Sequence, residues 1–357
     1  MNRKEERLLT PALPSTEEGR EKRARRRFGG PMREWFRGIL SPALSHRMGE
    51  GASSPRLTVH DTMIDLPLLT DVYQRHRAAF AARVQEFSLG GRYFAFNSKP
   101  ALMGVINLST DSWYRESVSL NAASAIQRGK VLYSQGAAIV DIGAESTLAN
   151  AGRAGLEAQA QKLIPVIEGL RSEGILVSVE TYEPEVARRS LAANANVINL
   201  TGRAGTEEIF GLAAIHDAAV IICYVEGTNV REVADFSLAG DPVDRMCGYF
   251  AEQITLAKKA GLEKIFIDPG LGFYYRNLQD SSVRVRHQMV TFLNTFRLRQ
   301  LGYPVCHALP HAFEFFQDEV RCAEPFFAVL AALGKTDLFR THEVPKVRAV
   351  LETMRSV

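Results

Sequence analysis

The segment ALMGVINLSTDSW, residues 101–113, decides the fold of this chain. An apolar run from Leu102 to Ile106 is followed by residues that form hydrogen bonds, namely Asn107, Ser109, Thr110, Asp111 and Ser112. A buried strand that ends in polar residues is typical of a parallel sheet whose carboxyl edge is exposed. The segment therefore predicts one strand of a parallel α/β protein.

The same unit, an apolar run with a polar end and then an amphipathic segment, recurs eight times after Lys99. We expect strands at residues 102–108, 138–142, 176–179, 197–200, 220–225, 264–267, 303–306 and 336–339. Helices are expected between them, among them 122–135, 157–172, 183–193, 241–260 and 344–355, and glycines mark several helix ends. Eight βα units predict a (β/α)8 TIM barrel over residues 101–357. An open doubly wound sheet is the alternative, which the absence of GxGxxG after the first strand disfavours.

Two further parts are predicted before the barrel. Residues 1–62 are rich in Pro, Gly, Arg and Glu without a sustained apolar period, which predicts a disordered basic N-terminal extension. A weak repeat, LTPALPSTEEGREK and LSPALSHRMGEG, leads to the hypothesis that much of it is translated upstream sequence, with the native start nearer Met48 or Met63. In residues 63–100 we expect a helix over 65–87 and a hairpin turning at Gly90-Gly91, which together brace the N-terminal end of the barrel.

The amino-acid composition limits the classes of protein to which this chain can belong. The 357 residues are 46% hydrophobic and 23% charged, as in ordinary globular proteins. No apolar run reaches the roughly 18 residues of a membrane span and no signal peptide begins the chain, so we expect a cytoplasmic protein without membrane contact. The four cysteines lack metal-site spacing and are interpreted as reduced core thiols.

Positive charge is concentrated at the start of the chain. Residues 1–60 carry 13 Lys and Arg against 7 Asp and Glu, whereas the remaining residues carry 30 against 33. The basic run Arg20–Arg27 has no interleaved aromatic residues, and we therefore interpret it as a solvated tail and not as a nucleic-acid-binding patch.

The active site of such a barrel lies at the C-terminal ends of the strands. The polar residues expected there are Asn107, Asp111, Asp141, Glu145, Thr147, Glu180, Asn199, Glu226, Asp268, His307 or His311, Arg340 and His342. A single polar strand end is normally a solvated loop start. Because nearly every strand supplies a carboxylate, an amide or a cation, we expect a binding site on this rim.

Six motifs in order, MGVINLSTDSW, DIGAEST, VSVETYEPEVA, VINLTG, IDPGLGF and FRTHEV, resemble dihydropteroate synthase and the wider pterin-binding family over about residues 87–354. The resemblance implies a transferase of folate biosynthesis that condenses p-aminobenzoate with a dihydropterin pyrophosphate and releases pyrophosphate. It also implies Mg²⁺ as cofactor, small-molecule pterin and amine substrates, and a homodimer.

The resemblance assigns pterin contacts to three residues. Asp268 and Asn199 match the pterin-binding Asp and Asn of the family, and Glu180 stands where the family has Asp. A carboxylate suits this role because it can pair in bidentate fashion with the guanidine-like donor edge of a pterin.

The resemblance places the leaving group and the second substrate at four other residues. Arg340 and His342 match the RxH anion site, and a period of two puts both side chains on one face of a strand end. Asn107 matches the residue that contacts metal and phosphate. Thr147 matches a Thr that contacts the anion or the amine.

The sequence departs from the family at three motifs. The first loop lacks the family's Pro and glycine-rich end, Leu148 and Ala149 replace an Arg-Pro pair, and HALPHAF replaces the motif that carries a pterin-side Lys. Among nearby residues, His307 and His311 are the donors that could substitute for this Lys. Catalytic activity is therefore an open question. The alternatives to a synthase are a divergent pterin-binding protein with another acceptor or methyl-transfer chemistry, and a catalytically silent pterin-binding or regulatory homologue; the retained RTH sequence argues against methyl transfer.

Overall fold

The computed structural model of the chain describes residues 63–109, 118–119, 121–145, 154–232, 235–236, 240–273, 275, 278 and 280–356. The barrel belongs to the compact unit of residues 62–237 and 242–357. The predicted basic extension, residues 1–62, lies outside the described residues.

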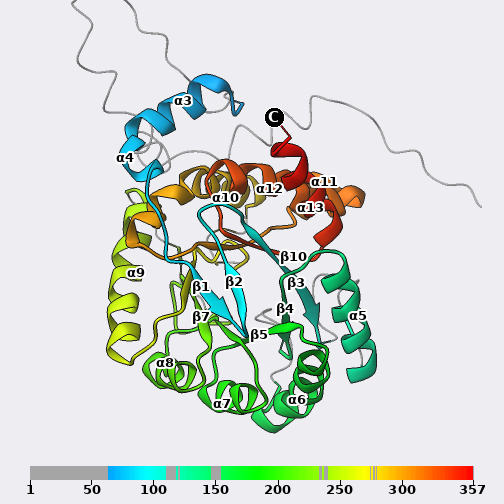
Figure 1. The fold of residues 1–357 in the computed structure, drawn as a ribbon. Helices are drawn as coiled ribbons and strands as arrows, with labels where there is room; N and C mark the ends of the chain where they lie inside the picture. Colours follow the sequence, from blue (N-terminus) through cyan, green and yellow to red (C-terminus); the bar gives the residue numbers. More distant parts are fainter. Residues whose placement is uncertain are drawn as a thin grey trace, which may run out of the picture. The chain divides into compact units, whose positions relative to one another are not determined.

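Eight parallel strands form one sheet in the order β8-β7-β6-β5-β4-β3-β10-β9. Figure 1 shows these strands surrounded by helices. Their bounds are β3 Ala101–Asn107, β4 Ile139–Gly143, β5 Leu176–Thr181, β6 Val197–Leu200, β7 Ala219–Cys223, β8 Ile265–Asp268, β9 Cys306–Ala308 and β10 Leu338–Thr341. A parallel bridge between Ile267 and Val305 links the end of β8 to the residue before β9 and closes the ring. The predicted (β/α)8 barrel is confirmed.

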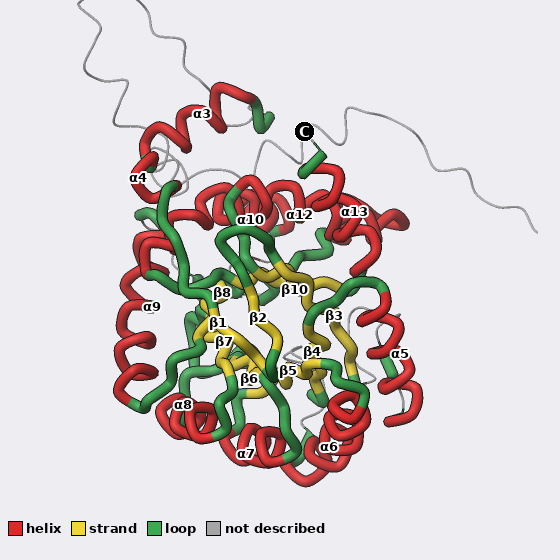
Figure 2. Tube along the Cα trace, in the orientation of Figure 1, coloured by secondary structure: helices red, strands yellow, loops and turns green. Residues whose placement is uncertain are grey.

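Helices lie outside the ring of strands (Figure 2). They are α5 Ala122–Ser134, α6 Leu156–Ser172, α7 Pro184–Ala192, α8 Thr206–Ile215, α9 Pro242–Lys259, α10 Ser281–Asn294, η3 Thr295–Leu301, α11 Phe313–Phe316, η4 Gln317–Cys322, α12 Ala323–Leu333 and α13 Val344–Met354. In α6 the buried residues Leu163, Val166, Ile167 and Leu170 follow the helical period and form one apolar face. Among the described helices, none combines the length and apolarity that a membrane span requires.

The segment before the barrel forms two short helices and a hairpin. The expected helix over residues 65–87 is instead α3, Leu66–Arg75, and α4, Arg77–Phe80, which are separated at His76. The predicted hairpin is present: β1, Phe87–Leu89, pairs antiparallel with β2, Arg92–Phe94. Its turn needs glycine because Gly90 and Gly91 both have positive φ, of 51° and 83°.

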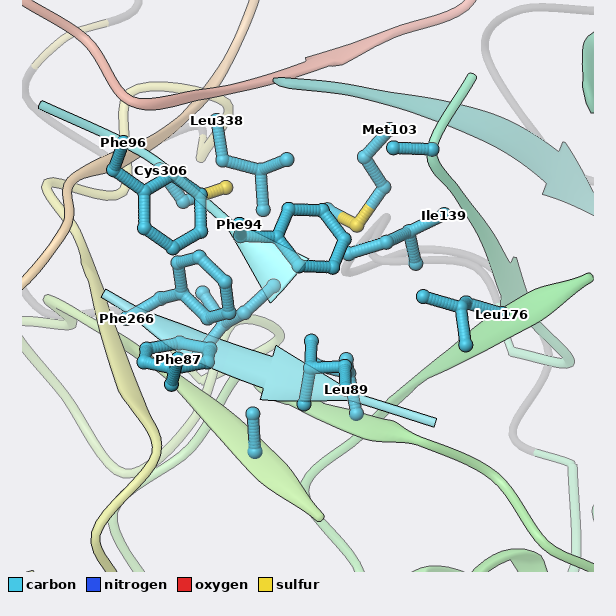
Figure 3. Close-up of a cluster of buried hydrophobic side chains, with 14 of the residues drawn as sticks. Phe87, Leu89, Phe94, Phe96, Met103, Ile139, Leu176, Phe266, Cys306 and Leu338 are labelled. Atoms are coloured by element: carbon cyan, nitrogen blue, oxygen red, sulfur yellow. The ribbon is translucent and has the colours of Figure 1, made fainter. Parts of the chain in front are cut away.

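Aromatic residues of this hairpin and of the residues just after it fill the N-terminal end of the barrel (Figure 3). The rings of Phe87 and Phe96 lie 5.2 and 5.4 Å from that of Phe266 in nearly perpendicular arrangements. They pack with Met103 and Ile139 near the starts of neighbouring strands, and each fully buried side chain of this size contributes roughly 2–3 kcal/mol. Because this end is filled with apolar side chains, the opposite end is left for polar ones.

The strands β9 and β10 begin two to three residues later than expected. The buried carboxylate of Asp337 accepts a hydrogen bond from the backbone N of Val305 at 2.8 Å and pairs with Arg299 at 3.3 Å, just before β10 begins. The start of an apolar run in the sequence therefore does not mark the residue at which the hydrogen-bonded pairing of the strands begins. As a consequence, Arg340 lies inside β10 and not after it.

Candidate functional site

Alternation along the strands brings the predicted polar residues into the barrel. Met103, Ile139, Leu176, Val197, Phe266 and Leu338 belong to the apolar cluster at the N-terminal end. Since successive side chains point to opposite faces, residues two or four positions later on the same strands also point inward. This register places Asp141, Glu180, Asn199, Asp268 and Arg340 at the C-terminal end of the barrel, and we call these five residues the polar cluster.

Arg340 is the centre of the polar cluster. Its Nε donates to Oδ2 of Asp141 at 2.8 Å, and its Nη2 donates to Oε2 of Glu180 at 2.5 Å. Asp141 is fully buried, and the side chains of Glu180 and Arg340 are only 13% and 16% exposed. The planar guanidinium offers donors in fixed directions, so the two carboxylates define its orientation.

Asn199 on β6 is oriented by Asp141, two strands away on β4, and by Cys223 on the adjacent strand β7. Its Nδ2 donates to Oδ2 of Asp141 at 3.3 Å, and its Oδ1 lies 3.5 Å from Sγ of Cys223. The amide is therefore part of the same hydrogen-bonded network as Arg340. All four cysteines are free thiols, and Cys223 and Cys306 are buried as predicted, but Cys322 is exposed.

Asp268 ends β8 and is held by backbone amides. Its Oδ1 accepts a hydrogen bond from the N of Gly270 at 2.8 Å. Gly270 has φ of 72°, and a Cβ there would lie 2.3 Å from the carbonyl oxygen of Tyr224, so only glycine fits this turn. The DPG sequence thus fixes the position of the carboxylate.

The polar cluster carries more acidic groups than basic ones. Burial raises the pKa of Glu180 to about 7; Arg340 opposes this shift, whereas Asp141 and Asp268 add to it. Burial also raises the pKa of Asp268 to about 6, against the hydrogen bond from Gly270 and the charge of Arg340. Three carboxyl groups around one guanidinium favour a ligand that presents hydrogen-bond donors over a bare anion.

His342 has a different set of partners from Arg340. It lies in the bend after β10, with Nδ1 2.8 Å from Oε1 of Glu324, a buried residue in the first turn of α12. Arg340 and His342 were expected to share one anion site. In the structure, Arg340 is bound to Asp141 and Glu180 inside the barrel, and His342 to Glu324 at its rim.

The two histidines near β9 differ in position. His307 is fully buried, with Nε2 2.7 Å from Oγ1 of Thr295 and its ring 4.7 Å from that of Phe292. It belongs to the layer between strands and helices, because alternation points it away from Cys306, and the expectation that it is a site donor is wrong. The ring of His311 lies 5.0 Å from that of His342. Burial lowers the pKa of His311 to about 4, so this imidazole does not supply the charge of a Lys at pH 7.

Asn107 ends β3 in register with Gly143 of β4 and is partly exposed. Its amide offers one oxygen ligand of the kind that Mg²⁺ takes, and Mg²⁺ usually completes its shell with water and phosphate oxygens, so the residue fits the implied metal role. Thr147 and Asp111 lie outside the described residues, as do Leu148 and Ala149.

A second buried ion pair at this end was not expected from the sequence. Arg231, whose side chain is 4% exposed, approaches Oε1 of Glu145 to 3.1 Å, and the hydroxyl of Tyr182 donates to Oε2 of Glu145 at 2.6 Å. Glu145 was expected on the rim, but Arg231 lies in a loop well after β7, where no strand-end pattern identifies it. Together with Tyr182, the ion pair joins the segments that follow β4, β5 and β7.

Known proteins share this chain's sequence pattern. Residues 103–309 match the family model described as pterin binding enzyme. The chain is 31% identical over 222 residues to the dihydropteroate synthase of Synechocystis, covering 61% of this chain and 73% of that protein. It is 27% identical over 268 residues to the dihydropteroate synthase of Escherichia coli K12, covering 73% of this chain and 91% of that one.

Solved structures share the fold. The dihydropteroate synthase of Xanthomonas albilineans with 4-aminobenzoic acid has a TM-score of 0.63 at 26% identity, covering 76% of this chain and 97% of that chain. The same enzyme in complex with 7,8-dihydropteroate has a TM-score of 0.59 at 25% identity. The matched family segment contains Asp141, Glu180, Asn199 and Asp268. This chain therefore belongs to the pterin-binding enzyme family.

Proposed function

We propose that this chain is a dihydropteroate synthase-like transferase of folate biosynthesis, which condenses a dihydropterin pyrophosphate with p-aminobenzoate. In this reaction the amine nitrogen bonds to the pterin methylene carbon, the carbon–oxygen bond to pyrophosphate breaks, and the amine loses a proton. Family membership and the names of its relatives support the reaction class. The observation that carries the proposal is the buried carboxylate of Asp268, held by the backbone of Gly270, together with the buried amide of Asn199 in the same polar cluster.

The pterin is proposed to bind with its donor edge toward Asp268. The carboxylate of Asp268 is 3% exposed and anchored through Oδ1 by Gly270, which fixes its direction before a ligand arrives. Asn199 adds an amide that can both donate and accept. A charge-assisted pair between a carboxylate and the pterin N–H groups is about twice as strong as a neutral hydrogen bond.

Arg340 is proposed to lie at the bottom of the pterin site, where it orients the carboxylates of the polar cluster. Its Nε and one terminal nitrogen already bind Asp141 and Glu180, so these donors are not directed at a diphosphate. Glu180 is one methylene longer than the Asp that the family has at this position, and its carboxylate contacts Arg340. We infer that this longer side chain strengthens the ion pair between the polar cluster and Arg340.

The diphosphate is proposed to lie toward Asn107 and His342, with Thr147 near the anion or the amine. Mg²⁺, when bound, would neutralise charge on the leaving pyrophosphate. Asn107 would hold that ion through its amide oxygen, and His342 would donate to a phosphate oxygen as negative charge accumulates. His311, next to His342, would orient the same end of the substrate.

A homodimer, which the resemblance to the family implies, remains a prediction.

A catalytically silent pterin-binding homologue is the second candidate. One specific observation favours it: the guanidinium assigned to the anion site is occupied by two carboxylates. The replacement of the family's Lys within HALPHAF and of its Arg by Leu148 points in the same direction. Such a protein would bind the pterin and leave the diphosphate intact.

Pyrophosphate release distinguishes the two candidates. The purified chain is incubated with dihydropterin pyrophosphate and Mg²⁺, with and without p-aminobenzoate, and pterin binding is measured in parallel. Release that depends on the amine supports the synthase. Tight pterin binding without release supports the silent homologue, and a chain that binds no pterin refutes both. Glu252→Gln, on the exposed face of α9, is the matched control for substitutions in the site.

A further inference from the structure

Three side chains outside the polar cluster converge at the C-terminal end of the barrel. They are His311 in the loop after β9, Glu324 in the first turn of α12 and His342 after β10. Their side chains are 13%, 1% and 11% exposed, and one ligand atom from each lies within 4.8 Å of the other two. We propose that His311, Glu324 and His342 bind a divalent transition-metal ion, with Zn²⁺ as the best-fitting candidate.

The spacing of the donor atoms is close to that of a coordination shell. Oε1 of Glu324 lies 2.8 Å from Nδ1 of His342 and 3.6 Å from Nδ1 of His311. Two ligand atoms that are each about 2.1 Å from an ion are separated by about 3.0–3.4 Å at angles between the octahedral and tetrahedral values. The ligand atoms of the two histidines lie within 4.8 Å of each other, so rotation of the imidazole rings toward each other would bring all three atoms onto one ion.

The surroundings of Glu324 orient one of its oxygens toward the two imidazoles. Oε2 accepts hydrogen bonds from the hydroxyl of Thr341 and from the backbone N of His342 and Glu343, the latter two at 2.9 and 3.1 Å. Oε1 is thereby directed at both histidine rings. Fixed carboxylate ligands of this kind are a general feature of metal sites, whereas a carboxylate that only anchors His342 would not require a second imidazole.

The donor set determines the type of ion. Two imidazole nitrogens and one carboxylate oxygen suit Zn²⁺, Co²⁺ or Fe²⁺, whereas Mg²⁺ prefers oxygen ligands alone. Three protein ligands leave at least one coordination position for water or a substrate oxygen. The inference is independent of the Mg²⁺ proposed at Asn107 and concerns a different ion held by different residues.

The test measures metal binding directly and not activity. The chelator-treated full chain is titrated with Zn²⁺ by calorimetry and with Co²⁺ by visible absorption, whose intensity reports a four- or five-coordinate ion. We expect one ion per chain, and at least about tenfold weaker binding together with loss of the Co²⁺ band in His311→Ala. His216→Ala is the matched control because His216 is an exposed histidine just after α8.

Folding of the variants is checked by circular dichroism, and His311→Gln, which keeps the size and polarity of the side chain, replaces His311→Ala if the latter is unfolded. Glu324→Gln is expected to weaken binding as well. Wild-type protein that gives no Co²⁺ band, or a folded His311 variant that binds both ions as tightly as wild type, would overturn the proposal. Failure of pterin binding or of pyrophosphate release would not affect it.

Discussion

Replacing Glu180 by Gln tests the charge balance of the polar cluster. The pKa of Glu180 is raised from 4.5 to about 7, mainly by burial. A difference of this size corresponds to about 3 kcal/mol between the protonated and ionised forms. Because the side chain is only 13% exposed, solvent screens little of this free energy.

The direction of the pH effect follows from proton binding. Between pH 4.5 and about 7 the folded protein holds the Glu180 proton while the unfolded chain has lost it, so the free energy of unfolding falls as the pH rises. The contribution is fully present below pH 4.5 and is lost above about pH 7. The amide that Glu180→Gln introduces carries no such proton, and its contribution would not change with pH. Asp337, whose pKa is raised to about 7, affects both proteins in the same direction and largely cancels in the difference, whereas Asp268 interacts with Glu180 and contributes to the difference.

Urea unfolding followed by circular dichroism, repeated across this pH range, measures the effect. We expect the stability of wild type relative to Glu180→Gln to decrease by about 3 kcal/mol between about pH 4.5 and about pH 8. Glu252→Gln should run parallel to wild type because Glu252 is exposed on α9. Parallel curves for wild type and Glu180→Gln would refute the inference that burial raises the pKa of this carboxyl group.

Other substitutions test the site and the fold. Asp268→Ala is expected to weaken pterin binding by about 2–3 kcal/mol in calorimetry, since it removes a charge-assisted pair, and unchanged affinity would exclude this carboxylate from the pterin site. Arg340→Ala should weaken pterin and pterin pyrophosphate to similar extents, because Arg340 holds Asp141 and Glu180; a loss confined to the pyrophosphate form would show instead that the guanidinium binds the anion. Phe266→Ala should lower the free energy of unfolding by about 3–5 kcal/mol, and a change below about 1 kcal/mol would mean that the hairpin aromatics do not depend on it. Gly270→Ala should destabilise the chain and displace Asp268, and normal pterin binding by this variant would contradict the close approach to Tyr224.

Much of the fold could be read from the sequence because its signals are local. Each βα unit carries its own apolar run and polar end, glycines mark several of the helix ends, and eight repetitions leave few topologies other than a closed barrel. The same pattern predicted that Asn199 and Asp268 lie at the C-terminal ends of strands, as they do. The errors are also local: the apolar runs before β9 and β10 include residues such as Val305 that precede the ladder, and the helix expected over residues 65–87 is interrupted at His76.

The partners of the site residues depended on tertiary structure. Periodicity predicts the face on which Arg340 lies, but the carboxylates that bind it are 199 and 160 residues away in the chain. Glu324 had no strand-end signal because it lies in a helix, yet it binds His342 and faces His311. Burial and charge at these positions arise only when strands distant in sequence close into one ring. The sequence by itself therefore determined the barrel and its polar end, and the tertiary structure decided which charges are paired there and which pKa values are shifted.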